Sequence, residues 1–335
     1  MHVPLSIPSP SVEWQYFDLT SWINSTFGAE LPGQLRIHAY ALCILVGIVA
    51  AVLITNHRLT KRGAERWVVI DVAIFAVPAG IVGGRFFHVV THPADYFAGQ
   101  EWWRAFAVWE GGLAIYGALL FGAVGVWLGC RYAGLRFSAF ADALAPGLLV
   151  AQASGRLGNW FNHELFGWPT DLPWGLEIES SNPAYPTGLP AGTLFHPTFL
   201  YEILWMLAGV AVLLVIERNV SMQWGKSLGF YLIWYGIGRS VFETIRTDPS
   251  LLFAGVRTNV WMSLLAIVLG VVVIALAMRR HTGRQPSPYV PGRSPSELRA
   301  EVDSDDVYTE DDDLEPVGTG TSETDVHDRT AAPRS

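Results

Sequence analysis

Residues 139–165 read AFADALAPGLLVAQASG-RLGNWFNHEL, an apolar run that ends in a polar signature. The apolar part, 139–155, is close to the length that a membrane span needs. Arg156 follows it directly, where lipid tails give way to water. An arginine that faces hydrocarbon is costly, so one retained at this depth is a candidate for a functional site. The flanking Gly155 and Gly158 would let another group approach the backbone closely.

The composition of the whole chain is that of a membrane protein. Of its 335 residues, 51% are hydrophobic and only 16% are charged, which excludes an ordinary soluble domain. Residues 281–335 contain 13 acidic residues against 5 arginines and account for the entire net charge of −8. This segment cannot bury enough apolar surface to order itself. We therefore expect a transmembrane domain over residues 1–280 and a disordered acidic cytoplasmic tail over residues 281–335.

Apolar runs of about 20 residues predict seven transmembrane helices. They cover residues 37–56, 68–90, 112–130, 138–156, 197–217, 226–246 and 259–278. Asp142 and Pro146 interrupt the fourth run, but a span tolerates proline when neighbouring helices satisfy the freed carbonyl. The expected fold is an all-α polytopic membrane protein, built as a bundle of seven transmembrane helices.

Lysine and arginine in the short loops predict the orientation of these helices. They gather in the loops after the first, third, fifth and seventh runs, and those loops are expected to be cytoplasmic. The N-terminus is then outside, the C-terminus is cytoplasmic, and residues 157–196 form an external loop. Cys43 and Cys130 would lie near opposite faces of the cell membrane, so we expect no disulfide.

The predicted helices carry their polar residues at the same depth. At 1.5 Å per helical residue, Arg156 lies about 27 Å from Ser138, and Arg239 lies about 20 Å from Lys226. The outer ends of the other spans contribute a further polar set: His38, Tyr40, Arg85, Glu110, Tyr116, His196, Tyr201 and Glu202. Six segments thus place polar side chains in the outer half of the bilayer, which predicts one composite site that faces outward.

The sixth span indicates the chemistry of that site. Tyr235, Arg239, Glu243 and Arg246 follow one another at intervals of 4, 4 and 3 and share one helix face. Arg239 and Glu243 can pair, and an ion pair that only holds the bundle together is the alternative interpretation. Together with Arg156 the site has surplus positive charge, and arginine is suited to bidentate contacts with phosphate. A phospholipid headgroup fits both the charge and the depth.

Several standard chemistries lack their motifs. The chain has no paired-aspartate motif for Mg²⁺, no phosphate-binding P-loop, no G-x-S-x-G elbow and no cysteine placed as a nucleophile at the outer face. We therefore expect a reaction without metal or cofactor, in which a second substrate brings the nucleophile. We expect no nucleic acid among the partners.

The signature Gly155-Arg156-Leu157-Gly158-Asn159-Trp160-Phe161-Asn162-His163-Glu164 closely resembles that of bacterial prolipoprotein diacylglyceryl transferases. Supporting matches follow in order: His38-Ala39-Tyr40, Gly83-Gly84-Arg85, Trp109-Glu110-Gly111-Gly112, His196-Pro197-Thr198-Phe199-Leu200-Tyr201-Glu202 and Arg239-Ser240-Val241-Phe242-Glu243-Thr244-Ile245-Arg246. The resemblance covers about residues 36–280, and the acidic tail outside it is similar to that of actinobacterial members.

The resemblance implies a membrane enzyme of lipoprotein biosynthesis. Such an enzyme transfers the sn-1,2-diacylglyceryl group of phosphatidylglycerol to the lipobox cysteine thiol of an exported prolipoprotein. A thioether forms and glycerol 1-phosphate leaves. The phosphate carries the developing charge, which fixed arginines in a dry site stabilise well.

We assign hypothetical roles on this basis. Arg156 and Arg239 bind the phosphate of phosphatidylglycerol, and Glu243 positions Arg239. Asn159 and Glu164 hold the glycerol headgroup or orient Arg156. The remaining substrate-binding candidates are Tyr40 and Tyr235 beside the phosphate, Arg246 as a guide for the anion, and His38.

One position departs from the family pattern. Many members carry a histidine, considered a proton acceptor, where this chain has Tyr116. A tyrosine with a pKa of about 10 is a poor base unless nearby arginines depress that pKa. The leaving phosphate, His38 and His196 are the other candidates for the proton acceptor, and we favour the phosphate.

Two functions compete with this interpretation: a transporter, and a lipid-binding protein without chemistry. Transporter sites usually lie near the bilayer midplane, whereas the polar residues here lie in the outer half of the bilayer.

Overall fold

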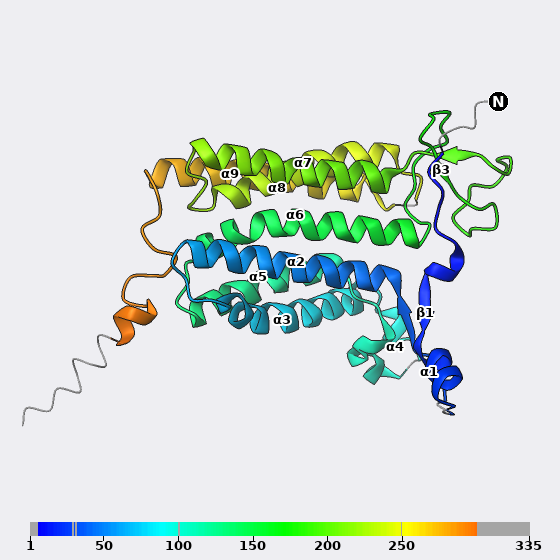
Figure 1. The fold of residues 1–335 in the computed structure, drawn as a ribbon, viewed down its shortest axis with the longest axis horizontal. Coiled ribbons are helices and arrows are strands. Elements are labelled where there is room, and N and C mark those ends of the chain that lie inside the picture. The colour runs from blue at the N-terminus through cyan, green and yellow to red at the C-terminus, as the bar shows by residue number, and fades with distance from the viewer. Residues whose placement is uncertain (1–5, 29, 31, 100, 249, 300–335) are drawn as a thin grey trace, which may run out of the picture. The chain divides into compact units, whose positions relative to one another are not determined.

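The computed structural model describes residues 6–28, 30, 32–99, 101–248 and 250–299, and these are mostly helical (Figure 1). The helices of 18 residues or more in this part of the chain are α2 (Ala39–Lys61), α3 (Val68–Thr91), α5 (Ile115–Tyr132), α6 (Phe137–Phe161), α7 (Thr198–Asn219), α8 (Lys226–Ile245) and α9 (Thr258–Arg280). Within the described residues, five of them, all but α6 and α8, are long and apolar enough to cross a membrane. The chain is therefore a polytopic helical membrane protein.

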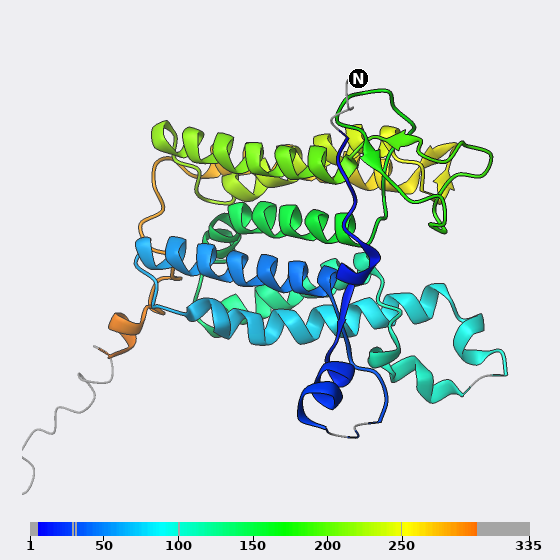
Figure 2. The ribbon, with the colours of Figure 1, turned by 45° about the vertical axis from the view of Figure 1, so that its right-hand side comes forward.

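The short elements gather at one end of the helical bundle (Figures 1 and 2). They form three antiparallel two-stranded sheets, β1 (Tyr16–Asp18) with β2 (Arg36–His38), β3 (Leu176–Glu177) with β4 (Leu194–Phe195), and β5 (Leu252–Phe253) with β6 (Val256–Arg257). The short helices at this end, among the described residues, are η1 (Val12–Trp14), α1 (Leu19–Phe27), α4 (Ala94–Phe97), η2 (Trp102–Phe106) and η3 (Val108–Glu110). The signature residues at the end of α6 lie at this end of the bundle.

Helix α6 is the central helix of the bundle. It packs against α2, α5, α7 and α8, and Figure 1 shows it between the layer of α2, α3 and α5 and the layer of α7, α8 and α9. Its buried residues include Asp142, whose carboxylate accepts hydrogen bonds from Gly225 N at 2.7 Å and Leu228 N at 3.1 Å. Because neighbouring helices rather than lipid cover α6, its residues need not be as apolar as those of a helix that faces lipid.

Small residues let neighbouring helices approach closely. A Cβ added to Gly117 on α5 would lie 2.2 Å from Gly83 O on α3, and one added to Gly47 on α2 would lie 2.9 Å from Ala151 O on α6. This packing is typical of membrane helices, which gain little from hydrophobic association within lipid. A stacked pair, Trp205 and Trp234, joins α7 to α8, and each indole N–H donates to the other residue's carbonyl.

The helix boundaries differ from the predicted runs in two places that matter for the site. Helix α5 begins at Ile115 rather than 112, because Gly111 and Gly112 have left-handed φ angles of 86° and 68° that break the helix before it. Helix α6 continues to Phe161, past the predicted end at 156, so most of the signature is helical. The segment predicted as an external loop from 157 therefore begins as helix.

The segment that follows α9 also differs from the expected tail. Tyr289 is buried, and its hydroxyl accepts a hydrogen bond from Glu65 N at 3.0 Å. Arg136 N donates to Pro288 O at 2.8 Å. Residues 281–291 thus belong to the helical unit, which ends at Pro291, and a second unit begins at Gly292. Residues 300–335, most of the predicted tail, lie outside the described residues.

Candidate active site

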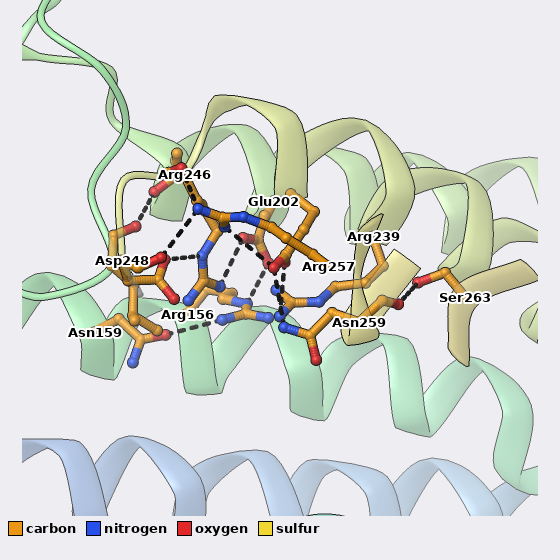
Figure 3. A network of polar contacts seen from close by, with 12 residues as sticks. Arg156, Asn159, Glu202, Arg239, Arg246, Asp248, Arg257, Asn259 and Ser263 are labelled. Atoms are coloured by element: carbon orange, nitrogen blue, oxygen red, sulfur yellow. Dashed lines mark hydrogen bonds and ion pairs between the residues drawn. The ribbon is translucent and has the colours of Figure 1, made fainter. Parts of the chain in front are cut away.

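A cluster of charged side chains lies where α6, α7, α8 and α9 meet near the end of the bundle that carries the sheets (Figure 3). Arg156 comes from the last turns of α6, and Glu202 comes from the second turn of α7. Arg239 and Glu243 lie one turn apart near the end of α8, and Arg246 follows that helix. Helices far apart in sequence thus contribute to one site.

The first half of the cluster is centred on Glu202, whose side chain is 4% exposed. Arg156 Nε forms an ion pair with Glu202 Oε2, and Arg246 Nη1 lies 4.0 Å from Glu202 Oε1. Arg246 Nε also donates to Asp248 Oδ1 at 2.6 Å. Burial raises the pKa of Asp248, but the hydrogen bond and charge of Arg246 outweigh that effect and hold this pKa below its ordinary value.

The signature residues continue this half of the cluster. Arg156 Nη1 donates to Asn159 Oδ1 at 3.3 Å, and Asn159 Nδ2 donates to Glu164 Oε1 at 2.8 Å. Asn162 Nδ2 donates to the same Glu164 oxygen at 3.2 Å. Side chains in the last turn of α6 and just after it are thus hydrogen-bonded to one another, and they restrain Arg156.

The second half of the cluster is centred on Glu243, whose side chain is fully buried. Arg239 Nη2 lies 3.0 Å from Glu243 Oε2, which confirms the pair predicted from their spacing. Arg257 Nη1 and Asn259 Nδ2 donate to Glu243 Oε1 at 3.2 and 3.0 Å. Tyr116 Oη donates to Asn259 Oδ1 at 3.0 Å, which connects α5 to this half of the cluster.

Cations exceed anions among the ion-paired side chains of the cluster. Four arginines (Arg156, Arg239, Arg246 and Arg257) meet three carboxylates (Glu202, Glu243 and Asp248). A fourth carboxylate, Glu164, accepts hydrogen bonds from Asn159 and Asn162 and forms no ion pair among the described residues. Arg239 Nη1 is buried and has no hydrogen-bond partner among the described residues. A buried charged donor without a partner is costly. The surplus charge and the free donor fit an anionic ligand better than a purely structural ion pair.

The other predicted site residues lie outside this hydrogen-bonded network, as far as the described residues show. The ring of Tyr40 packs against Gly158, two residues after Arg156. A Cβ added to Gly158 would lie only 2.7 Å from Tyr40 Cδ2. Tyr235 lies one turn before Arg239 and stacks on Tyr231 with 6.1 Å between ring centroids. His38 precedes α2, and its ring lies 5.9 Å from that of Tyr16.

Three members of the cluster were not assigned a site role from the sequence: Asp248, Arg257 and Asn259. For two of them, position in the sequence could have indicated a site role. Arg257 and Asn259 stand at the outer entry of the last apolar run, as polar residues do in the other spans. Glu202 was noted in the polar set, but its pairing with Arg156 depends on the packing of α6 on α7.

Arg85, in the Gly-Gly-Arg motif, has a separate task. Its guanidinium donates to the carbonyls of Arg104, Ala105, Gly111 and Gly112, with the Ala105 bond at 2.9 Å. A Cβ on Gly112 would lie 2.6 Å from Arg85 Nη1, so the second glycine of that pair makes room for the arginine. Arg85 thereby fixes the loop that leads into α5 and its Tyr116.

Within the described residues, no group of three or more His, Cys, Asp or Glu side chains is arranged to hold a metal ion. His163 Nδ1 lies 2.9 Å from Glu179 Oε2, and His196 Nδ1 lies 3.2 Å from Tyr201 Oη. Both histidines therefore have local partners of their own.

Comparison with known proteins identifies the family. The sequence profile of the family "Prolipoprotein diacylglyceryl transferase" matches residues 28–276. A phosphatidylglycerol–prolipoprotein diacylglyceryl transferase of Leifsonia xyli is 54% identical over 94% of this chain and 95% of its own length. Enzymes of the same name from Streptomyces griseus and Cutibacterium acnes are 46% and 44% identical, over 76% and 84% of this chain and 76% and 89% of their own lengths.

Proposed function

Since this chain belongs to the prolipoprotein diacylglyceryl transferase family, we propose that its arginine cluster holds the phosphate of phosphatidylglycerol during diacylglyceryl transfer. The enzyme carries out the first step of lipoprotein maturation. It moves the sn-1,2-diacylglyceryl group from phosphatidylglycerol to the lipobox cysteine of a prolipoprotein. The cysteine sulfur forms a bond to the glyceryl carbon, the bond from that carbon to the phosphate oxygen breaks, and glycerol 1-phosphate leaves.

The phosphate assignment depends chiefly on the surplus of arginines that are buried in large part. Arg156 and Arg239 have side chains only 20% and 13% exposed, and Arg239 Nη1 has no partner among the described residues. The reaction places additional negative charge on the phosphate as the carbon–oxygen bond breaks. Guanidinium donors fixed in advance in a site of low dielectric stabilise such charge without reorganising. Arg156 and Arg239 are accordingly the catalytic residues of the proposal.

The carboxylates and amides of the cluster orient these arginines. Glu243 positions Arg239 and is itself held by Arg257 and Asn259. Asn159 and Glu164 orient Arg156, to which Asn159 is hydrogen-bonded, or hold the glycerol headgroup. Tyr40 and Tyr235 hydrogen-bond near the phosphate, His38 is a further substrate-binding residue, and Arg246 guides the anion.

The thiol proton leaves with the phosphate in this proposal. Tyr116 Oη already donates its own proton to Asn259 Oδ1, and a neutral phenol is a poor base. His196 and His38 lie outside the hydrogen-bonded network of the described cluster. The leaving phosphate gains a basic oxygen when the carbon–oxygen bond breaks, so it can accept the proton with no further protein base.

For the whole chain we propose seven spans in the cell membrane, with the N-terminus outside, the C-terminus cytoplasmic and the arginine cluster toward the outer face. Helices α6 and α8 complete the bundle that the five apolar helices begin. The acidic residues 281–335 form the cytoplasmic tail, whose first residues pack on the bundle through Tyr289. The partners are phosphatidylglycerol, the prolipoprotein lipobox peptide and the bilayer.

The test uses the purified full chain, phosphatidylglycerol and a lipobox peptide. We expect a peptide whose mass has increased by one diacylglyceryl group, and an equal amount of released glycerol 1-phosphate. A peptide with serine in place of the lipobox cysteine, and phosphatidylethanolamine in place of phosphatidylglycerol, should give no product. Binding of phosphatidylglycerol without thioether formation would identify a lipid-binding protein instead.

A further inference from the structure

A basic cavity lies at the opposite end of the helical bundle from the arginine cluster, where α2 and α7 both end. Its volume is about 300 Å³. Four cationic side chains and one carboxylate line it: Arg58, Lys61, Arg62, Arg284 and Glu217. None of them takes part in the cluster around Arg156.

Charge in this cavity is not balanced. Glu217 is already held by Arg58, with Nη1 at 2.9 Å from one carboxylate oxygen and Nη2 at 2.5 Å from the other. Lys61, Arg62 and Arg284 have no carboxylate within ion-pair distance in the described part of the chain. Burial and the charge of Arg58 lower the pKa of Arg62, and the nearby carboxylates of Asp142 and Glu217 offset this effect only in part. An anion would relieve this repulsion.

Two residues of the cavity lining also have buried donors that the described residues leave unused. Arg58 Nε and Ser221 Oγ are both buried without a hydrogen-bond partner there. Buried polar atoms in folded proteins nearly always have partners, so each needs an explanation. A group with several acceptor oxygens would satisfy them together with the surplus cations.

We propose that this cavity binds the phosphate of an anionic phospholipid headgroup, separately from the donor lipid of the reaction. A phosphate group carries the charge and the acceptor oxygens that these residues require. Two apolar helices that can cross a membrane end beside the cavity, at Lys61 and Asn219, which is where lipid headgroups lie. The wall also includes Val220 and Met222, which suit the apolar part of a lipid and not free phosphate. Basic pockets between transmembrane helices are a recognised site for such headgroups.

Native mass spectrometry of the full chain with phosphatidic acid tests the proposal, because the number of retained lipids can be counted. The double variant Lys61→Gln/Arg284→Gln removes two unpaired charges of the cavity. We expect it to retain one lipid fewer than the unchanged chain and to need at least about tenfold more lipid for half-occupancy of that site. Its transferase turnover should stay within about twofold, because neither residue touches the arginine cluster, and this turnover shows that the variant is folded.

The matched control is Arg66→Gln/Arg218→Gln, which removes two exposed charges near the same end without altering the cavity lining. It should retain the same number of lipids as the unchanged chain. Equal losses in the two double variants would mean a diffuse charge effect and overturn the proposal. Displacement of the counted lipid by millimolar inorganic phosphate, with no preference for phosphatidic acid, would overturn the choice of a lipid and assign the cavity to the free anion.

Discussion

Arg156 and Arg239 form ion pairs inside the bundle with glutamates that are themselves almost fully buried. Glu202 and Glu243 have side chains 4% and 0% exposed. Such pairs contribute little net stability, because desolvation offsets most of the attraction, but removal of one partner leaves a buried charge that is strongly destabilising. Their presence therefore needs a reason beyond folding, and a bound phosphate supplies one.

The Tyr116→Phe variant separates the two possible roles of this tyrosine. The structure gives its hydroxyl one hydrogen bond, to Asn259, and a single such bond contributes about 0.5–1.5 kcal/mol. We therefore expect kcat to fall by less than roughly tenfold. Loss of a general base would lower kcat by about 10²- to 10⁴-fold. A fall in that larger range, measured with the lipobox peptide, would establish Tyr116 as the proton acceptor.

Residue spacing predicts contacts within one helix better than contacts between helices. Arg239 and Glu243 are four residues apart, so their pairing follows from helical geometry alone. Arg156 and Glu202 lie on α6 and α7, and no spacing rule reports how those helices are rotated against each other. The convergence of polar residues was visible as a shared depth, but the individual partners, such as Asn259, depend on packing.

At the scale of elements, the two glycines beside Arg156 differ in their surroundings. A Cβ on Gly158 would lie 2.7 Å from Tyr40 Cδ2 on α2 and 3.2 Å from Tyr40 Cα, whereas a Cβ on Gly155 would meet nothing within 4 Å. The close approach that the sequence predicted for both glycines thus occurs within the protein at Gly158 only. Gly155 leaves open space beside Arg156.

This difference predicts that alanine at these two positions changes the stability of the folded protein differently. Gly158→Ala forces α6 away from α2, and overpacking of this kind typically costs about 1–3 kcal/mol. Gly155→Ala adds a better helix former into open space and should be neutral or slightly stabilising. Unfolding temperatures in one detergent at a fixed scan rate provide the comparison. Equal destabilisation by the two substitutions would contradict the packing of α6 on α2.

The apolar runs predicted the long helices, since length and hydropathy are local properties of the sequence. They could not predict that α6 extends to Phe161, because the polar residues after Arg156 are as typical of a loop as of a covered helix end. The sheets were not predicted either. Strands of two or three residues, such as β3 and β4, are defined by their partners and leave no periodic pattern.

At the scale of the whole molecule, the distribution of lysine and arginine predicts which end of the bundle faces the cytoplasm. Arg58, Lys61, Arg279 and Arg280 lie at the ends of α2 and α9, the end that the positive-inside rule places in the cytoplasm. The arginine cluster comes from the ends of α6 and α8 and the start of α7, at the other end of the bundle, where Figure 1 shows β1 and β3. In this predicted orientation, the arginine cluster faces the outer side of the membrane and meets the prolipoprotein there.

Single cysteines in a chain without Cys43 and Cys130 test this orientation. We expect a cysteine at exposed Gly188, between β3 and β4, to react with a membrane-impermeant maleimide in intact cells. A cysteine at exposed Gly283, after α9, should react only after the membrane is opened. The reverse pattern would place the arginine cluster on the cytoplasmic side and contradict the proposed topology.

The central claim is that Arg156 and Arg239 stabilise the phosphate as the thioether forms, and the turnover of their alanine variants measures it most directly. Arg36→Ala, which removes an exposed arginine just before α2, is the control for loss of charge. We predict that Arg156→Ala and Arg239→Ala each lower kcat by roughly 10²- to 10³-fold or more, while Arg36→Ala stays near the unchanged enzyme. Near-normal turnover by both folded variants of the cluster would contradict the phosphate assignment.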